Sequence, residues 1–404
     1  MEILKKNKFH SIEESVFFNL IYDNQNFSKK PFNNLAKNVL HQLSSELLLS
    51  PFSKRIPQLV ALGFWLRPAQ LNKIYERVET FTDASHSLTS RGMAFHLPPQ
   101  NVDTLFVYSW ALSFLSGNIN IVRLPSELSD VTEWLVKLIS KILEENKLDK
   151  EQIFCRYDSE NSLTSAISKY ADLRIVWGGD EKVNLISHYP TRPDGISLGF
   201  PNRNSFCILS SNFYSSIAEN EKNQLVEKLY NDIFWFDQMG CGSPKAIFWL
   251  DKISDVANDL YKRLDHIAEC KEYEVEAGTS IAKFGHMNRK IATGEAFYGK
   301  RFSSRLSVLN SLSDKHIFTD AQGSGMIYDI DLNNISQISK YLDQTTQTIT
   351  HAGLDSSEIS ELTEIMSTYG GYRLVPLGEA LSFSDVWDGI DLMTHMTRKI
   401  TVKH

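Results

Sequence analysis

From Met93 onward, short apolar runs alternate with amphipathic segments of helical period, and this alternation constrains the fold more than any other feature. The apolar runs are too short for helices and predict strands at residues 93–97, 119–124, 152–157 and 173–177. Strands that alternate with helices build βαβ units around a parallel sheet. The sequence therefore predicts an α/β fold for this part of the chain.

The longest intervening segment is strongly amphipathic. Residues 131–143 carry one apolar stripe at helical spacing, and Asp130 with Glu133 has the spacing of a capping box, which predicts a helix that begins there. Residues 1–85 are also helical in pattern, with leucine and valine at three- and four-residue intervals. They contain no group that suggests chemistry.

A second α/β region follows. Strands are predicted at residues 205–210 and 246–250, with a helix at 219–236 between them. We place a domain boundary near residue 205. The last residues, 398–402, alternate polar and apolar side chains, so they predict a strand that pairs with a second copy of the chain.

Charge and cysteine content exclude several functional classes. Lys plus Arg number 42 and Asp plus Glu 49, so the net charge of −7 would repel a nucleic-acid backbone. The four cysteines lack zinc-ligand spacing, and their low number is typical of a reducing compartment. The N-terminus lacks a secretory signal, and the longest apolar stretch, 105–115, is too short to cross a bilayer. We expect a cytoplasmic protein without a membrane span, a metal or a nucleic-acid partner.

Cys241 lies between Gly240 and Gly242 at a predicted junction from helix to strand. Small neighbours leave backbone amides accessible and let a substrate approach the sulfur, which makes Cys241 a candidate nucleophile. A tight turn around a buried small residue is the alternative. The C-terminal end of the preceding helix disfavours a thiolate, so other amides or a cofactor would have to stabilise it. Cys155 and Cys207 fall in apolar strands and predict buried structural thiols.

Two further segments end predicted strands with polar groups. Asn101 follows the first strand, where its amide suits donation to developing negative charge; a helix N-cap is the alternative role. Arg123, Ser126 and Glu127 end the second strand. A cation, a hydroxyl and a carboxylate suit recognition of ribose and phosphate at the carboxyl end of a parallel sheet. A solvated loop is the alternative there.

Taken in order, these segments resemble the aldehyde dehydrogenase superfamily, and within it the LuxC-type acyl-CoA reductases. The resemblance rests on residues 99–102, 117–127, the glycine turn Trp177-Gly178-Gly179, the nucleophile segment 237–244, and the closing segments 343–348, 372–378 and 386–389. It extends from about residue 92 to the end of the chain, and residues 1–85 match poorly.

The resemblance implies an aldehyde dehydrogenase-like fold with a Rossmann-like cofactor domain, an α/β catalytic domain and a small oligomerisation extension. The corresponding assignments are a helical N-terminal region at 1–85, an NAD(P)-binding domain at 86–204 completed by about 366–390, a catalytic domain at 205–365 and an oligomerisation strand at 391–404. We accordingly expect a homo-oligomer.

The resemblance also implies a reaction, the reduction of a fatty acyl-CoA to the aldehyde. Cys241 would attack the acyl thioester, while Asn101 and a backbone amide would hold the oxyanion. A nicotinamide cofactor would then deliver hydride to the thioacyl-enzyme. The residues implied in cofactor binding are Arg123, Ser126, Glu127, Gly178 and Gly179.

Two departures from the superfamily pattern refine this expectation. Ser197 stands where hydrolytic members carry the glutamate that activates water, so a thioacyl-enzyme would persist until hydride arrives. Arg123 stands where many members carry lysine, and its guanidinium suits a 2′-phosphate. This favours NADPH, although Glu127 would suit the free hydroxyl of NADH.

The expected partners are an acyl-CoA or an acylated carrier protein, together with an acyl-protein synthetase. Two alternatives stay open. One is an aldehyde dehydrogenase that works oxidatively, and Ser197 in place of glutamate argues against it. The other is a non-catalytic scaffold of an acyl-transfer complex, and the presence of both Cys241 and Asn101 argues against that.

Overall fold

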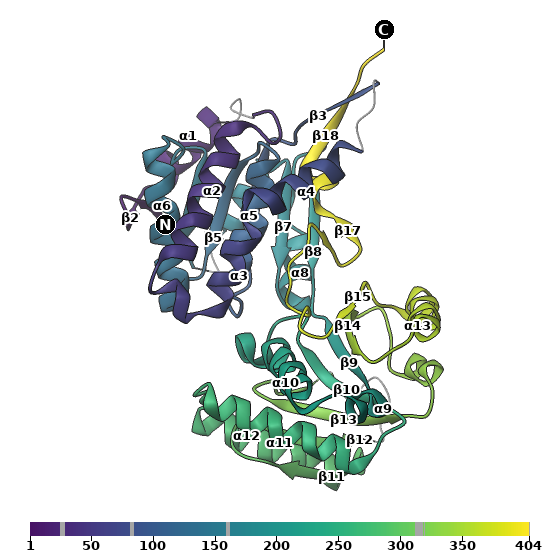
Figure 1. The fold of residues 1–404 in the computed structure, drawn as a ribbon. Coiled ribbons are helices and arrows are strands. Elements are labelled where there is room, and N and C mark those ends of the chain that lie inside the picture. The colour runs from purple at the N-terminus through teal and green to yellow at the C-terminus, as the bar shows by residue number, and fades with distance from the viewer. Residues whose placement is uncertain (25–28, 81–84, 159–161, 312–317, 319, 404) are drawn as a thin grey trace. The chain divides into compact units, whose positions relative to one another are not determined.

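The structure is a computed structural model that describes residues 1–24, 29–80, 85–158, 162–311, 318 and 320–403. The chain forms two compact units, the first from Met1–Pro201 with Phe383–His404 and the second from Asn202–Ser382. Each unit contains a seven-stranded, mostly parallel sheet accompanied by helices (Figure 1). The α/β fold class predicted from the sequence is confirmed.

The division falls close to the expected domain boundary but differs from the expected assignments in two places. Residues 1–85 belong to the first unit rather than to a region of their own. Residues 366–382 belong to the second unit, although 366–390 were expected to complete the cofactor domain. The reason is strand pairing, because β15 (Arg373–Pro376) pairs with β14 (Thr346–Ala352) of the second unit.

The sheet of the first unit has the strand order β2-β1-β6-β5-β4-β7-β8. Its strands are β1 (Glu2–Lys5), β2 (Lys8–Ser11), β4 (Met93–Leu97), β5 (Ile119–Leu124), β6 (Gln152–Arg156), β7 (Leu173–Trp177) and β8 (Ile196–Phe200). The last five are parallel, and β1 and β2 form an antiparallel edge. The strand order reverses between β4 and β7, a topological switch point at whose carboxyl ends ligands bind in open parallel sheets.

The helices of the first unit are α1 (Glu14–Asn24), α2 (Asn34–Leu49), η1 (Ser53–Arg55), α3 (Pro57–Trp65), α4 (Pro68–Glu79), α5 (Leu105–Leu115), α6 (Asp130–Glu145), α7 (Leu163–Ser168), α8 (Asp180–Ser187) and α14 (Leu392–Met396). All residues of β4 and β7 are buried, so the sheet is covered on both faces and these strands are mostly apolar, with His96 and Arg174 as buried polar members. Ser129 caps α6 by accepting from the Thr132 amide (3.1 Å). The predicted capping box is therefore wrong, because Asp130 and Glu133 both lie inside the first turn.

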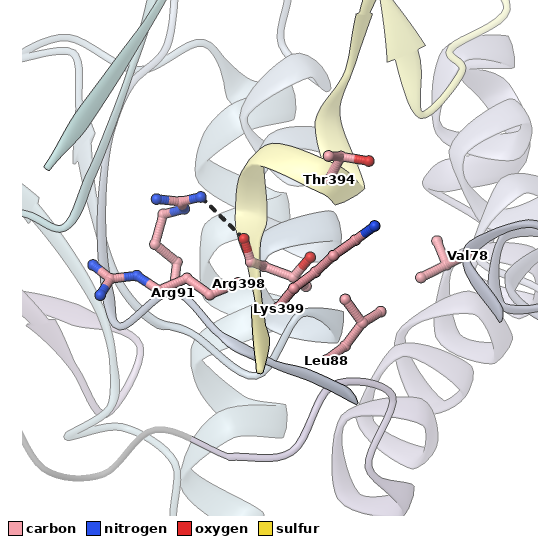
Figure 2. Close-up of a pocket in the computed structure, with 7 residues that line it drawn as sticks. Val78, Leu88, Arg91, Thr394, Arg398 and Lys399 are labelled. Carbon is pink, nitrogen blue, oxygen red and sulfur yellow. Dashed lines mark hydrogen bonds between the residues drawn. The ribbon is translucent and has the colours of Figure 1, made fainter. Parts of the chain in front are cut away.

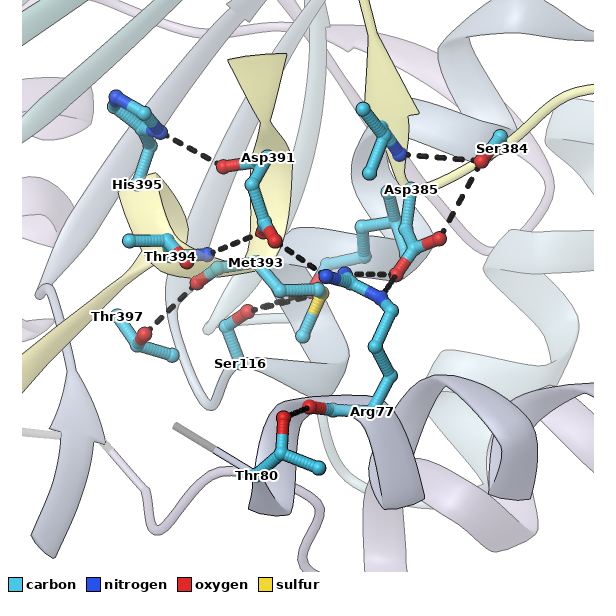
Figure 3. Close-up of polar contacts among 12 residues, drawn as sticks. Arg77, Thr80, Ser116, Ser384, Asp385, Asp391, Met393, Thr394, His395 and Thr397 are labelled. Carbon is cyan, nitrogen blue, oxygen red and sulfur yellow. Dashed lines mark hydrogen bonds and ion pairs between the residues drawn. The ribbon is translucent and has the colours of Figure 1, made fainter. Parts of the chain in front are cut away.

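An ion-pair cluster joins the N-terminal helices to the C-terminal segment of the same unit (Figure 3). Arg77 on α4 donates to the carboxylates of Asp385 and Asp391. Asp391 ends the short hairpin of β16 (Val386–Trp387) and β17 (Ile390–Asp391). Burial opposes ionisation of Asp391, but the hydrogen bonds from Arg77 and Thr394 and the charge of Arg77 together outweigh it and lower the pKa of that carboxyl. The cluster ties α4 to the C-terminal segment of this unit.

The predicted C-terminal strand is present as β18 (Thr397–Thr401). It pairs antiparallel with β3 (His86–Ser90) of the same chain. Pairing with a second copy stays a prediction. His404, the last residue of the predicted segment 391–404, lies outside the described residues.

The sheet of the second unit has the strand order β11-β12-β13-β10-β9-β14-β15. Its remaining strands are β9 (Asn204–Ser210), β10 (Pro244–Leu250), β11 (Ala296–Arg301), β12 (Ser307–Ser311) and β13 (Met326–Leu332). All neighbours are parallel except β11 and β12. Phe206 and Ile208 of β9 join one apolar cluster, whereas Cys207 and Leu209 join another, so this sheet is also covered on both faces.

The helices of the second unit are α9 (Ser211–Ser216), α10 (Glu219–Phe234), η2 (Trp235–Gln238), α11 (Ser254–Cys270), α12 (Ala277–Ala292), η4 (Ile335–Lys340) and α13 (Ser356–Tyr369). α11 is amphipathic and buries one apolar stripe that includes Leu260 and Leu264. Within the described parts of both units, none of the helices is long and apolar enough to cross a membrane.

A buried polar network crosses the core of the first unit. His96 on β4 lies with Nδ1 2.9 Å from Ser109 Oγ and with Nε2 2.8 Å from Asn120 Oδ1. Asn120 and Trp110 both donate to Gln152 Oε1 (2.8 and 2.9 Å). Asn120 therefore presents its carbonyl oxygen to His96, which identifies the imidazole as neutral with the proton on Nε2. Burial disfavours the charged ring and lowers the pKa of His96 to about 4.

We expect the stability of the first unit to fall in acid because of His96. An unfolded histidine takes up its proton near pH 6.5, whereas the folded ring takes it up only near pH 4. Stability should be complete above pH 6.5 and decrease below it, by about 2.5 kcal/mol at pH 4.5. Denaturant unfolding at pH 7.5 and 4.5 measures this loss. The variant His96→Gln should lack this share of the acid sensitivity, and an equal loss in both proteins would contradict the assignment.

Candidate functional site

The turn that carries Cys241 is strained. It lies between η2 and β10, with Cys241 half-buried. Just before it, Phe236, Asp237 and Gln238 adopt φ values of 53°, 53° and 62°, so three consecutive residues with side chains lie in the left-handed region. Each costs roughly 1–2 kcal/mol relative to ordinary conformations. Such strain concentrates at functional sites, where the surrounding structure must hold it in place.

Buried hydrogen bonds hold this strained segment. Gln238 donates from Nε2 to the carbonyl oxygens of Pro244 (2.7 Å) and Met326 (3.1 Å), and its Oε1 accepts from the Gly325 amide (2.9 Å). All polar atoms of this buried amide side chain are therefore engaged in fixing the backbone. Ser205 at the start of β9 adds a bond from its hydroxyl to the carbonyl of Cys241 (2.7 Å).

The glycines beside Cys241 allow a loop to approach closely. A Cβ on Gly242 would lie 2.4 Å from the carbonyl oxygen of Ala380, and one on Gly240 would lie 2.9 Å from Leu381 Cδ2. Glycine at 242 is required because the nearest group is backbone. The loop 377–382 thus packs directly against the cysteine turn.

A carboxylate and an arginine hold that loop. Asp232 on α10 accepts from the amides of Gly378 (2.7 Å) and Ala380 (3.0 Å). Arg373 on β15 donates to the carbonyl oxygens of Ala380 (3.0 Å) and Ser382 (2.8 Å). Burial raises the pKa of Asp232 to about 7. Asp232 and Arg373 hold the loop 377–382 through the backbone of Gly378, Ala380 and Ser382. The sequence analysis assigned no functional role to any of these five residues.

One side chain of the second unit contacts the sulfur of Cys241 directly. Gln347, the second residue of β14, donates from Nε2 to Cys241 Sγ at 3.3 Å. Gln347 lies in the segment 343–348 that the resemblance includes, but its residue type did not point to this pair, because a glutamine in an alternating strand is ordinarily structural. The contact depends on the order of the strands in the sheet, because β9 lies between β10, which follows Cys241, and β14, which carries Gln347.

The other cysteines behave as structural or surface residues. Cys155 and Cys207 are buried, and burial raises the pKa of each thiol to about 12, so the prediction of buried thiols is confirmed. Cys270 is exposed. In the described part of the chain, no group of three His, Cys, Asp or Glu side chains has the arrangement of a metal site.

Asn101 lies at the carboxyl end of the first sheet and is exposed. It follows β4 in an irregular segment, and α5 begins only at Leu105 with Thr104 in the N-cap position. Asn101 therefore does not cap the helix, which removes the alternative role considered for it. An exposed amide at this edge remains accessible to a ligand.

Arg123, Ser126 and Glu127 lie at the same edge. Arg123 donates from Nη2 to the carbonyl oxygen of Tyr157 (3.1 Å), and its guanidinium lies 5.0 Å from the centre of the Tyr157 ring. Its Nε is buried without a hydrogen-bond partner among the described residues. Glu127 is exposed. Ser126 lines a cavity of about 370 Å³ together with Tyr157, Met1, Glu2, Arg156 and Asp158.

The glycine turn after β7 accommodates a buried lysine. Gly178 has φ +157°, and a Cβ there would lie 2.7 Å from Lys182 Cδ, while Gly179 is the N-cap of α8. Lys182 donates from Nζ to the carbonyl oxygens of Pro98 and Trp177, both at 2.9 Å. It thereby links the carboxyl ends of β4 and β7 at the switch point. Burial, aided by the like charge of Arg123, lowers the pKa of Lys182 to about 8.

Ser197 lies near the start of β8 and contacts Arg174. Ser197 is the second residue of β8, pairs in register with Arg174, and accepts from Arg174 Nε at 3.1 Å. It lies before the carboxyl end of β8 at Phe200, whereas ligands of a parallel sheet bind beyond that end. The expected correspondence of Ser197 to the water-activating glutamate stays a prediction.

A second cavity of the first unit contains none of the predicted site residues (Figure 2). It measures about 430 Å³ and is lined by Val78, Leu88, Arg91, Thr394, Thr397, Arg398 and Lys399. Its two arginines have partners, because Arg91 donates to the Thr397 carbonyl (3.0 Å) and Arg398 pairs with Asp194 (3.1 Å). Both arginines are therefore engaged in contacts within the protein beside β18.

Comparison with known proteins places these features in a family. A family model described as acyl-CoA reductase (LuxC) matches residues 22–399. Long-chain acyl-protein thioester reductase of Aliivibrio fischeri is 23% identical over 263 residues, 64% of this chain and 53% of the relative. The protein of the same name from Photorhabdus luminescens is 23% identical over 163 residues, 40% and 32% respectively. The matched part of the chain thus spans about half the length of these relatives, or less.

Solved structures agree on the fold. An NAD-dependent aldehyde dehydrogenase from Sinorhizobium meliloti matches with a TM-score of 0.71 and 9% identity, over 99% of this chain and 94% of that one. The 1-pyrroline-5-carboxylate dehydrogenase of Thermus thermophilus matches with a TM-score of 0.67 and 10% identity, over 99% and 92%. The expected aldehyde dehydrogenase-like fold is confirmed.

Proposed function

Because the chain belongs to the acyl-CoA reductase (LuxC) family, we propose that it reduces a fatty acyl thioester to the aldehyde through a thioacyl-enzyme on Cys241. The observation that carries this proposal is the strained, half-buried turn in which a side-chain amide contacts the cysteine sulfur. Strained backbone is costly, and a structure that maintains it around a thiol supports a chemical role for that thiol.

The reaction divides into an acylation and a reduction. The Cys241 thiolate attacks the thioester carbonyl, a new C–S bond forms, and the carrier thiolate leaves and takes a proton from water. Asn101 and a backbone amide near Cys241 hold the oxyanion of each tetrahedral intermediate. Arg123, Ser126, Glu127, Gly178 and Gly179 would hold a nicotinamide cofactor, which when bound would supply the hydride that reduces the thioacyl group. Cleavage of the C–S bond would then release the aldehyde and return Cys241 as the thiolate that begins the next cycle.

The donors at the carboxyl edge of the first sheet suit a nicotinamide dinucleotide. Arg123 offers the charge of its guanidinium to a phosphate, and Ser126 offers a hydroxyl to a ribose. Glu127 and the glycines 178 and 179 lie on the same edge and complete the proposed set. We assign NADPH as the preferred cofactor, with NADH as the alternative.

Arg123→Ala should raise the Michaelis constant for NADPH about tenfold more than that for NADH, since only NADPH loses a 2′-phosphate contact. Steady-state kinetics with both cofactors measure the difference. Arg123→Lys keeps the charge but loses the planar fork, so it should fall between the two proteins. Equal effects of Arg123→Ala on both cofactors would show that Arg123 does not read that phosphate.

The substrate class follows from the family and its relatives. Fatty acyl groups carried on coenzyme A or on a protein are the proposed substrates, with an acyl-protein synthetase as the proposed source of the latter. The test is a panel of acyl-CoA chain lengths and an acylated carrier protein, scored by cofactor consumption and by aldehyde formation. Consumption of NADPH or NADH with matching aldehyde is expected. Release of free acid alone, or no turnover of any member, would contradict the proposal.

A further inference from the structure

The position of Cys241 leaves its reactivity to be explained. It follows α10 and η2 in the chain, and the left-handed residues 236–238 separate it from α10, so it has no helix N-terminus to favour a negative charge on the sulfur. A thiolate is nonetheless required for attack on a thioester. Some other group has to favour the charged form.

Gln347 is placed to do this. Its Nε2 donates to Cys241 Sγ at 3.3 Å, and the side chain is only 1% exposed. A hydrogen bond donated to the charged form of a group favours that form, and it is stronger in a buried site than in water. An amide also stays neutral at every pH, so the donor is always present.

The surrounding backbone fixes this contact. The Ser205 hydroxyl donates to the Cys241 carbonyl (2.7 Å) and accepts from the Thr348 amide (3.1 Å), so one side chain ties the cysteine turn to β14 beside Gln347. The Tyr372 amide donates to the Gln347 carbonyl at 2.9 Å. Donor and sulfur are thus held by neighbouring, mutually bonded segments, the preorganisation that catalytic hydrogen bonds need.

Charged groups also lie on the elements around the turn. They are Asp232, Asp237, Lys245, Arg373 and Glu379. Asp232 and Arg373 bind the loop 377–382, Asp237 accepts from Tyr273, and Lys245 donates to Asn204. All five charged groups remain when Gln347 alone is replaced. Their effect on the ionisation of Cys241 is therefore the same in the wild-type protein and in the variant.

We propose that Gln347 is a catalytic residue, whose side-chain amide stabilises the Cys241 thiolate before it attacks the thioester and again when the aldehyde departs. It donates a hydrogen bond and transfers no proton. The inference rests on the proposed function, because it gives the nucleophile of that reaction its stabilising partner.

The test measures alkylation of Cys241 by iodoacetamide against pH, with each cysteine quantified by peptide mass spectrometry. Gln347→Met removes the donor at similar volume, and we expect alkylation at pH 7 to fall about tenfold, with its pH midpoint shifted upward by about one unit. Exposed Cys270 is the internal reference and should not change. Gln344→Met, in the exposed turn three residues earlier, is the matched control.

Gln347→Glu keeps the shape of the side chain and places a carboxylate beside the sulfur, so its midpoint should rise further than that of Gln347→Met. If Gln347→Met does not fold, the pH midpoint of Gln347→Glu alone tests whether Gln347 stabilises the Cys241 thiolate. Unchanged midpoints in the folded variants would overturn the inference alone, because alkylation needs no acyl substrate. Absence of an acyl adduct on the wild-type protein would count instead against the proposed function.

Discussion

Cys241→Ala should abolish both acyl labelling and aldehyde formation while leaving cofactor affinity nearly unchanged. The sulfur is the atom that forms the covalent bond, and alanine offers no nucleophile in its place. Mixing the variant with a radiolabelled acyl-CoA, followed by denaturing gel analysis, measures labelling directly. Tryptophan fluorescence on addition of NADPH measures cofactor binding.

Cys270→Ala is the control for this experiment, since that thiol is exposed and lies outside the cysteine turn. It should retain full labelling and activity. Labelling of Cys241→Ala at the wild-type level would show that the acyl group is carried elsewhere, and the assignment of the nucleophile would then be wrong.

Asn101→Ala should lower the rate of reduction by about 10²-fold, the usual cost of losing one donor to an oxyanion. The fold should stay intact, because Asn101 is exposed and Thr104 rather than Asn101 occupies the N-cap position of α5. Single-turnover rates and a thermal melt separate the two effects.

The neighbouring Gln100→Ala provides the matched control, since Gln100 is exposed in the same segment and has no proposed role. Its rate should stay within twofold of wild type. If Asn101→Ala were fully active as well, the oxyanion donor would have to be sought among other residues, and Asn101 would lose its proposed role.

Strands were predictable where burial is nearly complete. β4, β5, β6 and β7 are largely buried, so each is a short, mostly apolar run that the sequence pattern reveals. The short motifs between and after these strands resemble those of the LuxC-type acyl-CoA reductases, and this resemblance predicted the family. Cys241 and Asn101 could be singled out because glycines and an amide at strand ends are local signals.

Contacts between distant segments left no such signal. Gln347 meets Cys241 only because β9 separates and aligns β10 and β14. The sequence pattern places Lys182 on a polar helix. In the structure its Nζ donates to the carbonyl oxygens of Pro98, just after β4, and Trp177, at the end of β7, which holds it at the switch point. Periodicity indicates which face of a helix or strand is buried, but it does not indicate which other segment packs against that face. The contacts of Gln347 and Lys182 could therefore be identified only from the structure.

The most direct test of the proposed reaction is a single-turnover chase. Wild-type protein is incubated with a long-chain acyl-CoA without cofactor, and the acyl group is located by peptide mass spectrometry before and after NADPH is added. The predicted result is an acyl thioester on the Cys241 peptide that disappears on addition of NADPH as an equal amount of aldehyde forms. Release of that acyl group as free acid, or its location on any other residue, would contradict the proposed thioacyl-enzyme on Cys241.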